Sequence, residues 1–424
     1  AGNEMAMGDG LYRNIPEAVK KGVLSMETVD EAVARVLRVK FKLGCFENPY
    51  APELPREKTC ILPDADDLSL KFARETMVLL KNDNKLLPLD PKKVRSIAIV
   101  GPAANEIHPH LGQWRAAAEP TPEYGETIGG VAKKFFPKAK LSFARGCAGW
   151  DYKTNPDDAA ECEKAVAVAK EADVVLLCFG ELPWMAGEIK SRRDICLPPG
   201  QRELIKALSS IGKPIVGLCC SGRALAFQEE LEAMDALLWM WQSGRRAPTA
   251  AMEILVGKVN PSGKLPITFP RSVGQIPIYY NCHGKITPEA HDYQDIQDED
   301  GPWFPFGFGM AYSTYKYDKV SVKKTNKGGL EARVSVKNTG KMAGKETIIW
   351  YLSDVEAKFT QPIRKVIAFE KVAIKAGETK EICLKIDPKR DLAYSLPNGI
   401  RILEPGKFVL SASMKSEAEF WFNE

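Results

Sequence analysis

The spacing of apolar residues changes twice along the chain. Over residues 12–43 apolar side chains recur at the spacing of one helix face. Over about 64–260 short apolar, β-branched runs alternate with longer helical patterns, and from about 315 apolar and polar residues alternate one by one. The three patterns predict a helical segment, an α/β domain and a β-rich domain, in that order.

The first pattern predicts two helices, of which the second is the longer. Ser25 is a good N-cap for this second helix, and Thr28 with Glu31 fits a capping box equally well. Gly44 is placed to end the helix. The proline-rich stretch that follows has no periodicity, which is typical of an ordered linker.

The second pattern predicts a mostly parallel sheet. Its expected strands span 96–101, 139–144, 173–180, 214–220 and 236–241. Its expected helices span about 66–81, 127–136, 156–172, 200–211, 224–233 and 247–256. Short β-branched strands separated by helices imply a sheet that is covered on both faces, which is an α/β/α sandwich.

The third pattern predicts a β-sandwich. Glycine-containing turns fall between its alternating segments, as in immunoglobulin or fibronectin type III domains. The expected organisation is therefore a helical segment at 1–45, a linker at 46–65, the α/β domain at 66–285, a connector at 286–314 and the sandwich at 315–424.

Composition removes several classes of function. The net charge is only +4 in 424 residues, and basic and acidic residues are interspersed, so no nucleic-acid partner is expected. No apolar run is long enough for a membrane helix. The ten cysteines form no CxxC pair, and His108 lies too close to His110 for a helical metal motif, so we expect reduced thiols and no metal. Reduced thiols favour the cytoplasm but also occur in the periplasm.

The candidate chemistry lies in one loop of the α/β domain, residues 179–200. Ligands of open α/β sheets bind beyond the carboxyl ends of the strands, where this loop is expected. It contains the candidate residues Glu181, Trp184, Met185, Glu188 and Arg192. A carboxylic acid beside apolar side chains can have a raised pKa, which suits a general acid. A solvated loop glutamate that pairs with Arg192 at the surface is the alternative interpretation.

Nucleotide binding and serine catalysis do not fit the same domain. The turn after its first strand has one glycine where a dinucleotide site needs GxGxxG, and neither GxxxxGK[ST] nor GxSxG occurs.

Several segments, read in order, resemble glycoside hydrolase family 3. They include AGNEMAM, FARETMVLLKNDNKLLPL, NPSGKLPITFPRSVGQIPIYY, FPFGFGMAYS and VKNTGKMAGKETIIWYL. The resemblance implies that 1–45 is the end of a (β/α)8 barrel and that the sandwich is a fibronectin type III-like domain. It further implies a retaining β-glycosidase without a cofactor, in the periplasm or secreted, which acts on terminal β-D-glucosyl or β-D-xylosyl residues of oligosaccharides or plant-polysaccharide fragments.

The resemblance also assigns roles within the loop. The acid/base glutamate of the family falls on Glu188, just before the dipeptide Ser191-Arg192, and Glu181 falls on a glutamate that is often present. Trp184, Met185 and Arg192 are expected to bind substrate or to support the site.

Two departures from the family pattern change the expectation. In the family, the nucleophile is an Asp that lies shortly upstream of the segment that AGNEMAM resembles. This chain begins inside that segment, and Glu4 stands where the family usually has Asp. We therefore expect the nucleophile to be absent, since the single Ser-Asp pair, Ser353-Asp354, lies in the sandwich. The run QSGRRAPTAA also stands where the family often has two adjacent glycines. Three hypotheses follow: half of an enzyme that needs a barrel, a silent fragment, or a sugar-binding or scaffold module.

Overall fold

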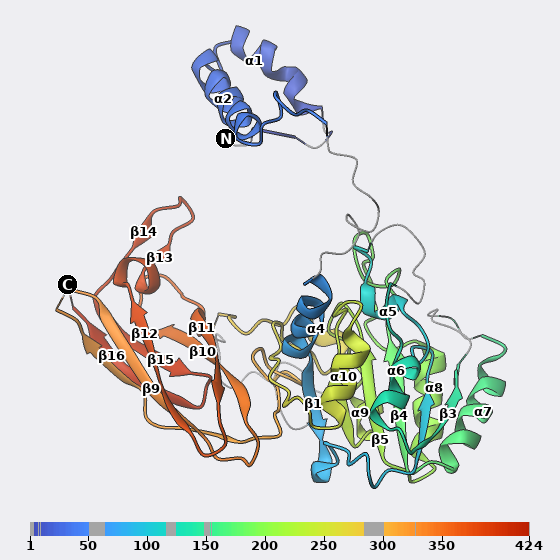
Figure 1. The fold of residues 1–424 in the computed structure, drawn as a ribbon. Coiled ribbons are helices and arrows are strands. Elements are labelled where there is room, and N and C mark those ends of the chain that lie inside the picture. The colour runs from blue at the N-terminus through green and yellow to red at the C-terminus, as the bar shows by residue number, and fades with distance from the viewer. Residues whose placement is uncertain are drawn as a thin grey trace. The chain divides into compact units, whose positions relative to one another are not determined.

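The computed structural model describes residues 4–6, 8, 10–50, 64–115, 124–147, 153, 155–283, 301–326 and 328–423. The chain divides into two compact units, 1–63 and 64–424 (Figure 1). Much of the predicted linker and part of the predicted connector lie outside the described residues, and the domain boundaries stay predictions. None of the helices in the described ranges combines the length and the apolar character that a membrane span requires.

The first unit contains two helices, as predicted. They are α1 (Ile15–Lys20) and α2 (Met26–Lys42), and a short 3-10 turn at Leu11–Asn14 precedes them. The Ser25 side chain accepts the backbone N–H of Thr28 at 3.1 Å, so Ser25 is the N-cap of α2. Among the described residues of α2 none is buried, although the helix has an apolar stripe. The exposed apolar residues of this helix are Met26, Val33, Leu37, Val39 and Phe41.

A six-stranded sheet forms the centre of the α/β domain. Its strands are β1 (Val78–Asn82), β2 (Ser96–Val100), β3 (Lys140–Ala144), β4 (Val174–Gly180), β5 (Ile215–Cys220) and β6 (Ala236–Trp239). Their order is β1-β6-β5-β4-β2-β3, and all neighbours are parallel except β1 and β6. Every residue of β4 and β5 is buried, as expected for strands in the middle of a covered sheet.

Helices cover both faces of this sheet, which confirms the α/β/α prediction (Figure 1). One core cluster includes residues of α4 (Ala65–Thr76), α6 (Ile128–Phe135) and α10 (Ala247–Leu255). The other cluster includes residues of α7 (Asp158–Lys170), α8 (Pro199–Ser209) and α9 (Gln228–Glu232). The short helix α5 (His108–Leu111) lies in the loop after β2.

Two predicted helices are wrong in extent. The segment 66–81 is helical only to Thr76, and β1 follows, because Val78 and Leu79 pair with Trp239 and Leu238 of β6. A short apolar run fits a helix and a strand equally well, and here the sheet decides. The predicted helix 224–233 shrinks to α9, because residues 224–227 are not helical and the N–H of Ala226 donates to the carbonyl of Ile195 at 3.0 Å.

The second part of this unit is the predicted β-sandwich. One sheet contains β11 (Lys365–Ile374), β10 (Gly344–Asp354), β15 (Gly406–Ala412) and β16 (Ser416–Phe422), in that order. The other contains β12 (Thr379–Ile386), β9 (Leu330–Asn338) and β7 (Tyr315–Tyr317), with β8 (Ser321–Lys324) also paired to β9. A small third sheet joins β13 (Tyr394–Ser395) to β14 (Arg401–Ile402). Inward residues of β9 and β10 share one apolar core with β15, as the alternating pattern requires.

Ion pairs join the α/β domain to the sandwich. Glu75, near the end of α4, pairs with Lys345 of β10 and with Lys371 of β11. The Lys371 ammonium also donates to the backbone carbonyl of Glu75 at 2.9 Å. Burial raises the pKa of Glu75, but hydrogen bonds from Lys345 and Lys371 outweigh that effect, and the pKa is lowered from its usual value of 4.5.

We predict that Glu75→Gln lowers the free energy of unfolding by about 1 kcal/mol at pH 7. A carboxylate with a lowered folded-state pKa stabilises the fold above its usual pKa, and that contribution disappears as the pH falls through the folded-state pKa. The difference from the parent chain should therefore shrink between pH 5 and pH 3, as measured by urea unfolding. Glu419→Gln, at an exposed pair with Lys407, is the control. A difference that does not change with pH would contradict the assignment.

Candidate active site

The candidate loop begins where β4 ends at the carboxyl edge of the sheet. Gly180 has φ 123°, and a Cβ there would lie 1.9 Å from the carbonyl oxygen of Cys220 on β5, so only glycine fits. The Gln201 side chain of α8 accepts from the N–H of Gly180 at 2.9 Å and donates to its carbonyl at 3.0 Å. The N–H of the next residue, Glu181, donates to the backbone carbonyl of Cys220 at 2.7 Å. These contacts fix the point from which the loop departs.

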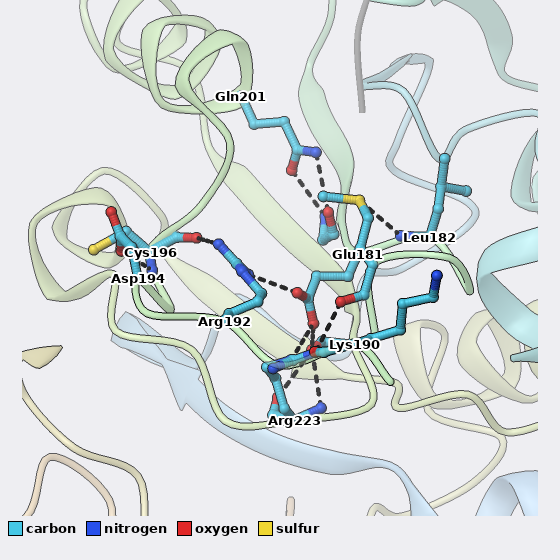
Figure 2. A network of polar contacts seen from close by, with 11 residues as sticks. Glu181, Leu182, Lys190, Arg192, Asp194, Cys196, Gln201 and Arg223 are labelled. Atoms are coloured by element: carbon cyan, nitrogen blue, oxygen red, sulfur yellow. Dashed lines mark hydrogen bonds and ion pairs between the residues drawn. The ribbon is translucent and has the colours of Figure 1, made fainter. Parts of the chain in front are cut away.

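Glu181 is the centre of a buried polar network (Figure 2). Its side chain is 0% exposed. One carboxylate oxygen lies 2.6 Å from Nη1 of Arg192, and the other accepts the hydroxyl of Ser221 at 2.7 Å and lies 3.3 Å from Nε of Arg223. Two guanidinium groups therefore share one carboxylate that is itself closed to water, where an unpaired charge would be strongly destabilising.

The two arginines carry this anchoring to the rest of the loop (Figure 2). Nη2 of Arg192 donates to the carbonyl of Cys196 at 3.0 Å. Nη2 of Arg223 donates to the carbonyls of Met185 at 2.8 Å and Lys190 at 2.7 Å. One buried carboxylate thus organises the loop backbone at both ends and in the middle.

Glu188 lies between the two segments that Arg223 holds, and it is exposed. Its carbonyl accepts from Nε2 of Gln113 at 3.3 Å, and the N–H of Lys190 donates to the carbonyl of Gly187 at 3.2 Å. Gly187 has φ 154°, and a Cβ there would lie 1.6 Å from Oε1 of Gln113. The backbone around Glu188 is therefore closely held, while its side chain is open to the exterior of this unit.

The other candidate residues divide between the interior and the surface. Met185 is buried, and its sulfur accepts the N–H of Leu182 at 3.4 Å. Arg192 is 8% exposed and pairs with Glu181, so it is not the surface residue that its spacing from Glu188 allowed. Trp184 is 53% exposed, and its ring centre lies 6.0 Å from that of His108 in an edge-on contact. Glu188 and Trp184 are the candidates that face outward.

Sequence reasoning missed Arg223, Ser221 and Gln113. Ser221 and Arg223 directly follow β5, which is the neighbour of β4 in the sheet. The carboxyl ends of adjacent parallel strands meet at one edge, so the sequence SGR after a predicted strand was a usable signal.

Thiols and an imidazole under this edge are structural. Cys220 Sγ lies 3.5 Å from Nδ1 of His110, and both residues are buried. Burial lowers the pKa of His110 to about 4 and raises the pKa of Cys220 to about 12, so both are uncharged near neutral pH. Within the described ranges, no three His, Cys, Asp or Glu side chains gather as metal ligands would.

The departure at QSGRRAPTAA adds charge to a neighbouring edge of the domain. Arg245 lies 3.5 Å from Asp66 of α4, and Arg246 pairs with Asp66 and, at 3.2 Å, with Glu126. These pairs connect the start of α10 to α4 and to the residues before α6.

Comparison with known families identifies the two domains of the second unit. Residues 77–312 match the glycosyl hydrolase family 3 C-terminal domain, and residues 346–416 match a fibronectin type III-like domain. The chain belongs to glycoside hydrolase family 3. The resemblance of its motifs to this family is thereby confirmed.

Family 3 relatives of the chain are named as β-glycosidases. A periplasmic β-glucosidase of Salmonella typhimurium is 35% identical over 96% of the chain, which covers 57% of that relative. A β-xylosidase of Formosa agariphila is 31% identical, with 96% and 56% covered. The structure of a β-glucosidase from Listeria innocua with isofagomine is similar at a TM-score of 0.85 and 31% identity, over 99% of the chain and 59% of that protein. The chain thus spans somewhat more than half the length of these relatives.

We predict that Glu181→Gln costs about 3–5 kcal/mol of folding free energy, because it leaves the buried guanidinium of Arg192 and the partly buried guanidinium of Arg223 without a counter-charge. Urea unfolding of the chain measures the change. Glu230→Gln is the control, since Glu230 pairs with Arg202, whose side chain is 47% exposed, and should cost no more than about 1 kcal/mol. Equal, small losses in both variants would show that the buried pairs do not matter.

Proposed function

We propose that this chain supplies the general acid/base of a retaining β-glycosidase and that Glu188 is that residue. The observation that carries the proposal is the presentation of Glu188: an exposed carboxyl group on a loop at the carboxyl edge of the sheet, with its backbone held by Arg223 and Gln113. Its place in the family's loop pattern, four residues before Arg192, supports the same role.

Retaining hydrolysis needs two carboxyl groups about 5–5.5 Å apart. In the first step a nucleophilic aspartate of the barrel forms a bond to the anomeric carbon, the glycosidic C–O bond breaks, and Glu188 gives its proton to the departing oxygen. In the second step the Glu188 carboxylate takes a proton from water, the water oxygen bonds to the anomeric carbon, and the aspartate is released. The net reaction consumes one water and leaves both carboxyl groups as they began.

The exposure of Glu188 agrees with a site that a barrel completes. A general acid must reach the substrate, so in the absence of the barrel it should face outward. Covering it with a barrel would remove water and bring the nucleophile's negative charge near, and both effects raise the pKa of a carboxyl group toward the range useful for an acid. Trp184, exposed on the same loop, offers an apolar ring face to a sugar, whereas Glu181, Met185 and Arg192 support the loop from inside.

The first unit supports the need for a barrel. The exposed apolar stripe of α2 has no buried member among its described residues, and such a surface normally packs against another element. We propose that residues 1–45 are the end of the (β/α)8 barrel and that the remainder of that barrel carries the nucleophile.

The substrate class follows from the relatives. Because they are named β-glucosidase and β-xylosidase, we propose terminal β-D-glucosyl or β-D-xylosyl residues of oligosaccharides as substrates. The relative named periplasmic favours that compartment for this chain, with the cytoplasm as the alternative.

We predict that Glu188→Gln, in the chain combined with a family 3 barrel, slows hydrolysis of substrates with poor leaving groups by about 10²–10⁴-fold. Substrates with good leaving groups need no proton and should form the glycosyl intermediate almost normally, and azide should then speed its breakdown. The measurement is kcat/KM, which reports formation of the intermediate, across aryl β-glycosides of graded leaving-group pKa, together with kcat for good leaving groups with and without azide. Glu163→Gln, at an exposed position on α7, is the control. A small loss, or one that azide leaves unchanged, would exclude Glu188.

We also predict that the chain alone does not hydrolyse aryl β-glucosides or β-xylosides and that adding a barrel domain produces hydrolysis. The reason is that one carboxyl group cannot perform a double displacement. Hydrolysis by the chain alone would contradict the proposal. Sugar binding without hydrolysis in the presence of the barrel would instead favour a binding module. The absence of both sugar binding and hydrolysis would favour a silent fragment.

A further inference from the structure

Arg223 holds both ends of the short segment that carries Glu188. A single nitrogen, Nη2, donates to the carbonyl of Met185 at 2.8 Å and to that of Lys190 at 2.7 Å. Residues 186–189 lie between these two carbonyls. We call residues 186–189 the tip. The width of the tip at its base is thus set by one guanidinium group.

This guanidinium is itself held from behind. Its Nε lies 3.3 Å from the fully buried carboxylate of Glu181, and the N–H of Arg223 donates to Oγ of Ser221 at 3.1 Å. Ser221 donates in turn to Glu181 at 2.7 Å. Because Arg223 is anchored through both its backbone and its charge, it can impose a position on the tip rather than follow it.

The tip needs such a restraint. Ile189 has φ 59°, a conformation that a β-branched residue disfavours, and its side chain is 93% exposed, so packing does not hold it there. Without Arg223, two carbonyls would lose their donor and the backbone could relax. The direction of the Glu188 side chain would change with it.

We propose that Arg223 is a positioning residue that sets where Glu188 presents its proton. The proposal rests on the general acid/base role of Glu188. Arg223 need not touch the substrate, because it acts through the backbone of the tip. A planar guanidinium can reach two carbonyls while it faces a carboxylate, and the ammonium of a lysine matches this geometry only in part.

The kinetic test uses the chain combined with a family 3 barrel and compares Arg223→Met, Arg223→Lys and Glu188→Gln. We expect Arg223→Met to lower kcat/KM by about 10–100-fold for poor leaving groups, because a misplaced acid transfers its proton badly. For good leaving groups kcat/KM should change little, although kcat should fall because the second step needs the same group as a base, and Arg223→Lys should recover part of both rates.

The control is Arg74→Met, which removes a partly buried ion pair outside the loop. Arg74 donates two hydrogen bonds to Glu253, each of 2.6 Å. A loss in Arg223→Met that is equal for all leaving groups, as a general loss of folded protein would give, overturns the proposal. If the rate loss in Glu188→Gln itself does not depend on the leaving group, the proposed function is wrong. This result is distinct from a failure of the Arg223 proposal alone.

Hydrogen exchange of the chain alone tests the restraint without catalysis. The N–H of Lys190, which donates to Gly187, should exchange at least about 10-fold faster in Arg223→Met than in Arg74→Met, as expected for local opening. Equal exchange in the two variants would show that Arg223 does not hold the tip and would overturn the proposal.

Discussion

The loop that carries the candidate chemistry depends on one enclosed carboxylate that two guanidinium groups share. Glu181 is fully buried, and without Arg192 and Arg223 its charge would be strongly unfavourable there. The reverse also holds, because both arginines would then lack their counter-charge. The three side chains can therefore be buried only together, and their burial also fixes the backbone carbonyls to which the arginines donate.

Two glutamates in one loop thus have opposite environments. The Glu181 side chain is buried, and both of its carboxylate oxygens are paired. The Glu188 side chain is exposed, and the contacts around it hold its backbone. The Glu181 carboxylate is out of reach of a substrate, whereas the exposed side chain of Glu188 can be brought against a sugar. The division of the proposed roles follows from burial, since the two side chains are chemically the same.

How much the sequence could predict depended on the distance over which each contact acts. Local periodicity was enough for α2, for the buried strands β4 and β5, and for the alternating β9. It failed for β1, where pairing with β6 overrode a helical pattern. In the site, the motif resemblance selected Glu188, but the partners of Glu181 could not be paired from spacing alone. Arg223 comes after a different strand, and only the register of β4 against β5 brings it to the loop.

The placement of the proposed acid on a restrained loop has a consequence for the proposed site, which a barrel would complete. If the tip ordered only when a barrel or a sugar arrived, part of the binding free energy would be lost to the entropy of fixing it. Here the bonds from Arg223 and Gln113 restrain the tip within a single folded domain, through contacts that need neither barrel nor substrate. The cost of ordering is therefore met when the α/β domain folds. In the proposed enzyme, what would remain for assembly with the barrel is to exclude water from Glu188 and to bring the second carboxyl group within reach.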